Sequence, residues 1–196
     1  GDIPLKFTAD IHEVTYTRVA GNGFEENDEV GVFALVGSST MKEERYADNL
    51  RFFRTSEKVF ESSEPIYYPD DEVTLRLISY YPYQEEGVNM GESTMSVAVE
   101  TDQNLSAGYF CSDFLVASQN LQSAPKGAIA LHYDHKFFKL KIALVGKEGE
   151  ELQGILDADP KLSVCGFYTK AIYDFQKETY SAFSNEKSIT PAGKWE

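Results

Sequence analysis

The sequence has few basic residues and no long apolar run, and each shortage excludes a class of protein. Its 18 lysine and arginine residues stand against 32 acidic ones, which gives a formal net charge of -14. A surface of that sign repels phosphate backbones and anionic lipid headgroups, so nucleic acid is excluded as a partner. No stretch approaches about 18 consecutive apolar residues, so no membrane-spanning helix is predicted. No basic-then-apolar leader is present, and we expect either a cytosolic chain or an exported chain whose leader has been removed.

The sequence also lacks the motifs that carry catalysis or metal binding. Its two cysteines, Cys111 and Cys165, have neither CxxC nor Cys/His spacing, which excludes a zinc site and a disulfide framework. Each lies in an apolar, strand-like stretch, so we expect buried free thiols, with a single bridge as the alternative in an exported chain. His132 and His135 are three residues apart in a strand region and point to opposite faces. With no phosphate loop and no G-x-S-x-G elbow either, we expect no catalytic residue, metal or cofactor.

The composition favours a β-rich domain. The chain of 196 residues contains 13 Phe, 12 Tyr and 1 Trp, and aromatic and β-branched residues favour pleated sheet. The continuous apolar run 30–36 predicts a central strand that is covered on both faces. Further strand candidates, separated by turn residues, are 73–77, 97–99, 114–117, 128–131 and 138–144. Many short strands with turns between them predict an all-β sandwich or barrel.

The pattern changes after residue 145. Residues 146–157 predict one short helical turn, which Pro160 ends. Three further strand candidates follow at 162–168, 172–175 and 179–183. They are too few to close a separate sandwich, so they either complete the first domain or open a second one. We favour the second alternative, with an N-terminal β-sandwich at 1–146 and an incomplete second β-domain at 147–196.

The first eleven residues read as one half-buried strand. Apolar and polar side chains alternate along it, and Pro4, which cannot donate a backbone hydrogen bond, predicts a strand at the edge of a sheet. The apolar face consists of Ile3, Leu5, Phe7, Ala9 and Ile11. A polar stretch at 15–29 follows and contains one arginine, Arg18. A terminal edge strand attached through such a stretch can be removed by proteolysis, and its removal leaves a groove.

Two tyrosine pairs precede prolines and invite a binding interpretation. The tyrosines of these two segments are Tyr67, Tyr68, Tyr80, Tyr81 and Tyr83. Tyrosines at a rim stack on sugar rings, because the ring faces are apolar and the hydroxyls form hydrogen bonds. The alternative is that they fill the end of the sandwich while each proline ends strand pairing.

An ordered series of short motifs resembles the fimbrillin (Mfa-like) family of Bacteroides-type bacteria. The series is Ile3-x-Leu-x-Phe7, Thr17-Arg18, Phe24-x3-Asp28-x-Val-Gly-Val-Phe-Ala34, Tyr46-Ala-Asp-Asn49, Tyr67-Tyr-Pro69, Ser79-Tyr-Tyr-Pro-Tyr83, Asp102-Gln103, Ser112-Asp-Phe-Leu115 and His135-Lys-x2-Lys-Leu140. No single piece is specific, but their order over residues 3–144 is. The stretches 162–166 and 172–175 resemble the opening strands of the second domain of that family.

The resemblance implies a fold, a location and a mechanism. Members of the family are exported lipoproteins with two transthyretin-like, Greek-key β-sandwich domains, and they assemble into fimbriae on the outer membrane. A trypsin-like protease cuts after an arginine behind the first strand, and a segment of a neighbouring subunit replaces that strand. Arg18 is the matching candidate for the cut, and other fimbrial subunits are the implied partners. The lipidated cysteine of the family is absent from this sequence.

Two other classes of function stay open. A non-polymerising surface adhesin could bind a glycan or a surface protein of host or bacterium through the tyrosine-proline ends. A secreted hydrolase would need a cleft with converging polar groups, and the sequence identifies none. We therefore expect a structural or adhesive subunit of surface fimbriae and not an enzyme.

Overall fold

The computed structural model describes residues 3–12, 23–69, 72–104 and 112–195. Within these ranges nearly all of the regular secondary structure is strand, with one short helix, which confirms the all-β prediction. The elements are β1 (Phe7–Ile11), β2 (Glu29–Val36), β3 (Ala47–Arg54), β4 (Phe60–Ser62), β5 (Leu75–Tyr81), β6 (Thr94–Ala98), β7 (Leu115–Leu121), β8 (Ile129–His135), α2 (Leu152–Asp157), β9 (Val164–Asp174) and β10 (Thr179–Ile189).

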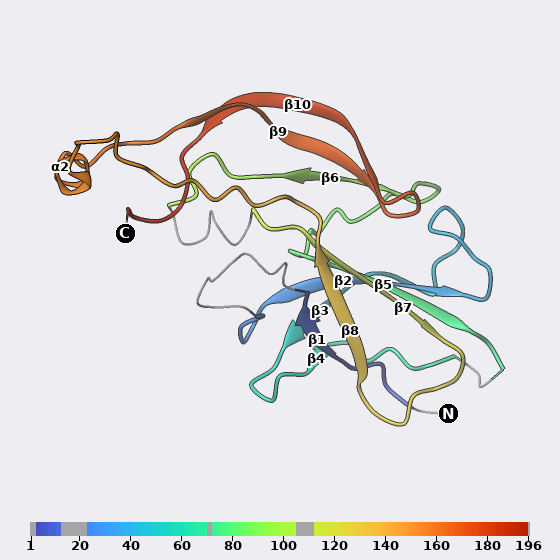
Figure 1. Cartoon of the computed structure of the whole chain (residues 1–196). Coiled ribbons are helices and arrows are strands. Elements are labelled where there is room, and N and C mark those ends of the chain that lie inside the picture. The colour runs from blue at the N-terminus through green and yellow to red at the C-terminus, as the bar shows by residue number, and fades with distance from the viewer. Residues whose placement is uncertain (1–2, 13–22, 70–71, 105–111, 196) are drawn as a thin grey trace.

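The strands form a closed barrel with a separate sheet packed over one side (Figure 1). Around the barrel the strand order is β1-β4-β3-β2-β5-β7-β8, and β1 closes it by pairing in parallel with β8. The other pairs in the barrel are antiparallel. The separate sheet has the order β10-β9-β6. The layered arrangement agrees with the predicted sandwich, while the Greek-key detail stays a prediction.

Strand β2 is buried on both faces, and β5 is buried on both faces from Leu77 to Tyr80. Val30, Val32 and Ala34 of β2 point into the barrel core, whereas Phe33 and Leu35 pack into a second core beneath the sheet β10-β9-β6. Because successive side chains of a strand point to opposite faces, a strand between two cores must be apolar at every position. The prediction of a central strand at 30–36 is therefore confirmed.

The last two strands complete this second core. β9 pairs with β6 from Thr94 to Ala98, and its side chains Ala171 and Tyr173 pack in the second core together with Phe175, which follows it. The strands after residue 147 thus finish the packing of the preceding part of the chain. They bury their apolar side chains against the barrel wall that they cover, and the division of the chain at residue 146 stays a prediction.

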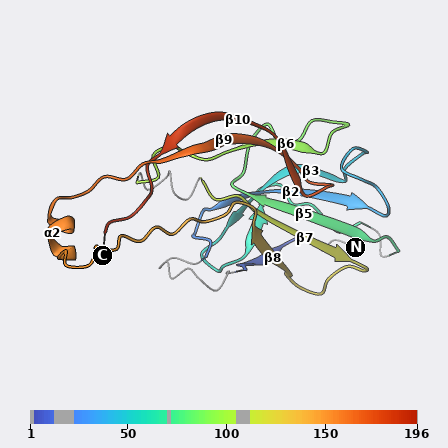
Figure 2. The same cartoon turned by 45° about the horizontal axis from the view of Figure 1, so that its top comes forward.

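The segment between β8 and α2 differs from its prediction. Alternation over 138–144 predicted a strand, but this stretch is extended and has no strand partner among the described residues. It leads away from the barrel to α2, which both views place at the far end of the molecule (Figure 2). The chain returns from α2 into β9, and the indole Nε1 of Trp195 donates to the carbonyl of Pro160 at 2.8 Å. The predicted helical turn is confirmed as α2.

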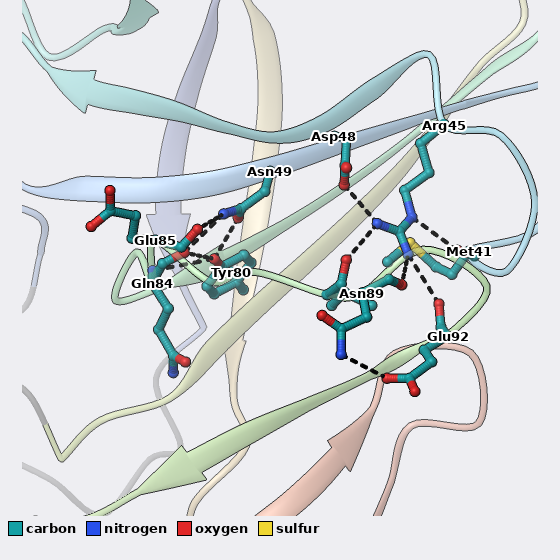
Figure 3. Close-up of polar contacts among 10 residues, drawn as sticks. Met41, Arg45, Asp48, Asn49, Tyr80, Gln84, Glu85, Asn89 and Glu92 are labelled. Carbon is teal, nitrogen blue, oxygen red and sulfur yellow. Dashed lines mark hydrogen bonds and ion pairs between the residues drawn. The ribbon is translucent and has the colours of Figure 1, made fainter.

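Arg45 joins two loops of the body through a buried guanidinium group (Figure 3). It donates to the backbone carbonyls of residues 41, 88, 89 and 92 at 2.8–3.0 Å and to the carboxylate of Asp48 at 2.6 Å. Its plane also lies over the ring of Phe33, 5.4 Å from the ring centroid. These contacts use all of the donors that a guanidinium has. The loop 88–92 is thereby held against the start of β3.

Tyr80 makes the neighbouring connection between β5, β3 and the loop that follows β5 (Figure 3). Its hydroxyl donates to the Oδ1 atom of Asn49 at 2.6 Å and accepts the backbone N–H of Gln84 at 3.2 Å. The side-chain amide of Asn49 donates to the carbonyl of Gln84 at 2.8 Å. Burial raises the pKa of Tyr80 to about 12. The hydroxyl therefore stays protonated and serves as a structural donor.

We expect Arg45→Lys to lower the free energy of unfolding by about 3 kcal/mol, because an ammonium group cannot reach carbonyls on two loops and leaves buried acceptors unpaired. Urea denaturation measures this change. Arg51→Lys is the matched control, since that side chain is exposed and its ion pair with Glu29 is long, at 3.8 Å; the control should change stability by less than about 1 kcal/mol. Equal effects of the two substitutions would contradict the role given to Arg45.

Candidate functional site

The first strand lies against three parts of the barrel wall. Phe7 to Ile11 pair in parallel with residues 129–133 of β8 over the whole length of β1. On the other edge, Phe7 pairs with Phe60 of β4, and Pro4 forms a bridge with Tyr67. The N–H of Leu5 donates to the carbonyl of residue 66 at 2.8 Å, and the N–H of residue 68 donates to the carbonyl of residue 3 at 2.9 Å.

The edge-strand prediction was therefore wrong for residues 3–7 and holds only beyond them. Pro4 suggested an edge because its nitrogen cannot donate, but the bridge to residue 67 uses the N–H groups of residues 5 and 68 instead. From Thr8 to Ile11 the edge away from β8 has no strand partner among the described residues. β1 is thus paired fully on one side and only at its start on the other.

The apolar face of the first strand fills the barrel core unevenly. Leu5 and Phe7 are fully buried, Ala9 and Ile11 are half-buried, and Ile3 is 40% exposed. The ring of Phe7 stacks on Phe60 at 5.0 Å and meets Phe52 at 5.1 Å between centroids. The alternation seen in the sequence is confirmed, but two side chains supply most of the burial.

Charged pairs on the outer face connect the first strand to its neighbours. Lys6 bonds to Glu61 at 2.7 Å, and Asp10 contacts the Nδ1 atom of His132 at 2.7 Å. These side chains are exposed, so each pair stabilises little and serves mainly to match the strands in register. The sequence interpretation missed both pairs. The charged residues Lys6 and Asp10 on the polar face of the alternating strand were the feature that could have indicated them.

The two histidines do not form one site. His132 faces Asp10, whereas the Nδ1 atom of His135 lies 2.9 Å from a carboxylate oxygen of Asp113. The hydrogen bond to Asp113 raises the pKa of His135 above its ordinary value, although partial burial opposes this. Among the described residues no group of three or more His, Cys, Asp or Glu side chains could hold a metal ion.

The five tyrosines do not form a common rim. Tyr67 is 44% exposed, but Tyr68 lies in the barrel core and Tyr80 in the second core. Tyr81 packs against Phe24 in the barrel core, and Tyr83 is half-buried beneath Arg51. The rim prediction was wrong because adjacent tyrosines in a strand point to opposite faces, and here both faces are covered.

The remaining candidates are a thiol and a cleavage site. Cys165 is a free, exposed thiol on β9, 3.2 Å from the hydroxyl of Ser188, so its predicted burial was wrong: the first half of β9 extends beyond the second core. Cys111 and Arg18 lie outside the described residues. No helix in the part of the chain that the structure describes is long and apolar enough to span a membrane.

The sequence profile of fimbrillin-like proteins matches residues 17–195, which is most of the chain. The chain belongs to the fimbrillin-like family. A search of curated proteins found no match.

Two solved structures share the fold of this fimbrillin-like chain. One is described as a candidate cell adhesion protein of Bacteroides ovatus, with 16% identity and a TM-score of 0.63 over 100% of this chain and 75% of that one. The other, described in the same way, is from Bacteroides uniformis, with 20% identity and a TM-score of 0.65 over 97% of this chain and 69% of that one.

We expect Phe7→Ala to destabilise this fimbrillin-like chain by about 3–5 kcal/mol, because it leaves a cavity beside the rings of Phe52 and Phe60 in the barrel core. Ile3→Ala, on the same face of the strand but 40% exposed, should stay within about 0.5 kcal/mol of the parent. Chemical denaturation followed by circular dichroism measures both. A small effect at Phe7 would show that the barrel does not depend on the first strand.

The contact of His135 with Asp113 should make stability depend on pH. Because the pKa of His135 is raised in the folded state, its stabilisation is complete below the ordinary histidine pKa of about 6.5 and is lost as pH rises through the folded-state value. The urea midpoint should therefore fall from about pH 6 to pH 8, and Asp113→Asn should flatten this slope. An unchanged slope in Asp113→Asn would assign the pH dependence to other groups.

Proposed function

We propose that this chain is a subunit of a surface fimbria and that a strand of a neighbouring subunit replaces its first strand after proteolysis. The observation that carries the proposal is the position of Leu5 and Phe7: a strand at the start of the chain fills the core of a barrel that the rest of the chain builds. Membership of the fimbrillin-like family supports a fimbrial or adhesive role over catalysis.

The geometry of β1 suits replacement better than an interior strand would. Its pairing with β4 consists of one residue pair, while β3, β2, β5, β7 and β8 remain connected to one another without it. Departure of β1 therefore breaks the ladder with β8 and the short contacts at residues 3–7, but it need not separate the other strands. An extended segment can enter such a gap and reform the main-chain hydrogen bonds.

The energetics require a substitute strand. Leu5 and Phe7 each contribute about 1.5–3 kcal/mol by burial, so loss of both takes away a large share of the roughly 5–15 kcal/mol that stabilises a typical domain. While the chain is intact, β1 is held at high effective concentration by its covalent connection. A cut after Arg18 ends that advantage, and a strand with two apolar side chains at the same spacing can then compete.

The proposal includes a place and partners. The chain acts at the outer membrane surface as a processed lipoprotein, with other fimbrial subunits and a trypsin-like protease as partners. The alternative of a monomeric, glycan-binding adhesin has lost part of its support, because Tyr68 and Tyr80 are buried and only Tyr67 of the five tyrosines is prominently exposed.

An arginine-specific protease tests the proposal, since Arg18 is the one basic residue between residues 12 and 23. We expect limited digestion to cut after Arg18 and to produce ladders on unheated SDS gels and filaments in electron microscopy. The gels contain reductant, because Cys165 is an exposed thiol that could otherwise link copies through disulfides. Arg18→Lys is the matched control: with this protease it should give no SDS-resistant ladder, and it should give one when trypsin is used instead. A clean cut at Arg18 that leaves a stable monomer would refute strand replacement and favour the adhesin.

A further inference from the structure

The segment that joins β8 to α2 is basic in an acidic protein. Residues 136–147, here named the basic arm, hold four of the chain's 18 basic residues and none of its 32 acidic ones. It is the extended stretch that leads away from the barrel (Figure 1). Because the arm is positively charged and the rest of the chain is strongly acidic, the arm is attracted electrostatically to a second copy of the chain.

The basic arm is also amphipathic and incompletely covered. Leu140 is 55% exposed, and Phe138 is 73% exposed although its ring contacts Phe167 at 5.8 Å. Ile142 and Leu144 are half-buried and continue the same alternating face. No strand pairs with the arm among the described residues. Extended apolar alternation without a ladder is the pattern of a strand whose partner is missing.

A groove in the barrel wall is complementary to the basic arm. β4 pairs with β3 only at residues 52–54, so the edge of β3 from Ala47 to Arg51 faces no strand among the residues that the structure describes. After β4 the chain bends away at Pro65 and pairs with the first strand at residue 67. A shallow groove of about 600 Å³, open to solvent, lies between these two edges and is lined by residues 45–48, 50 and 64–67. We name it the seam groove.

The chemistry of the seam groove suits an apolar, basic strand. Leu50 and Ile66 are half-buried against the barrel core and give the groove an apolar base. Tyr46 and Tyr67 are 43% and 44% exposed at its border, and the hydroxyl of Tyr46 donates to the carbonyl of residue 67 at 2.7 Å. The charge of Arg45 is turned inward, where it pairs with Asp48, and Glu64 is exposed.

We propose that residues 140–144 of the basic arm bind as an added strand in the seam groove of a second copy of this chain. The unpaired edge of β3 from Ala47 to Arg51 has the same length as this part of the arm. Leu140, Ile142 and Leu144 then cover the apolar base, and Lys139 and Lys141 lie near Glu64. Because arm and groove are different surfaces, the contact is head-to-tail and extends into a chain of copies.

The unpaired strand edge favours a peptide segment over a sugar as the ligand of the seam groove. β-Augmentation uses main-chain groups for affinity and alternate side chains for specificity, and both are available here. This inference rests on the proposed role as an assembling subunit, but it uses other residues and needs no cleavage. Its failure is therefore distinguishable from failure of strand replacement at β1.

The test is self-association of the uncut chain. All variants also contain Arg18→Ala, which removes the proposed cleavage site, and association is measured by sedimentation velocity at low salt. We expect association in the micromolar range that Leu140→Asp weakens at least tenfold. Ala143→Asp, the same substitution on the opposite face of the arm, should weaken it less than threefold. A synthetic peptide of residues 136–147 should compete with association and slow amide exchange at residues 47–51.

A charge exchange between the two surfaces gives the decisive control. Glu64→Lys and the double variant Lys139→Glu/Lys141→Glu should each associate poorly alone, and a mixture of the two should recover association because one arm and one groove are again complementary. All substituted side chains are exposed, so the variants should fold. Absence of recovery, or binding of oligosaccharides at Tyr46 and Tyr67 with no effect of Leu140→Asp, would overturn the proposal.

Discussion

The contact of Phe7 with Phe52 and Phe60 makes the barrel core depend on the start of the chain. The ring centroids lie 5.1 and 5.0 Å apart in the two pairs that Phe7 forms, and Leu5 is buried in the same core. Interiors are packed as densely as organic crystals, so a missing ring of this size is not absorbed by small movements. Whatever strand lies beside β8 must therefore supply a large apolar side chain at this place.

The second core would keep the body folded during the strand replacement that we propose. None of its described members belongs to β1: it is built from β2, β5, β6, β7 and β9 with the loops that join them. The Arg45 contacts and the Tyr80–Asn49 hydrogen bond also lie on this side of β2 and β5. Stability is thus divided between a core that the first strand completes and a core that is independent of it.

The sequence predicted those features that depend on local alternation and missed those that depend on distant partners. The run 30–36 identified a strand between two cores, because a short apolar run without any polar position has no face that it can turn to water. The same logic was wrong for 138–144, since alternation shows that a strand could form and not that a partner is present. Arg45 gave no signal, because its carbonyl acceptors come from residues 41 and 88–92. The tyrosine rim was wrong because burial of both strand faces is a tertiary property.

The pairing of β1 with β8 also limits which strand could take its place. A shift by one residue would turn the apolar face outward and the charged face into the core. Outside the barrel, Glu61 and His132 stand opposite Lys6 and Asp10, so an entering strand with acidic and basic residues interchanged at these positions would meet a like charge at Glu61. Each pair contributes little to stability, but together with the spacing of two buried side chains they select register and direction. Specificity in such a system comes from this combination and not from the strength of any one contact.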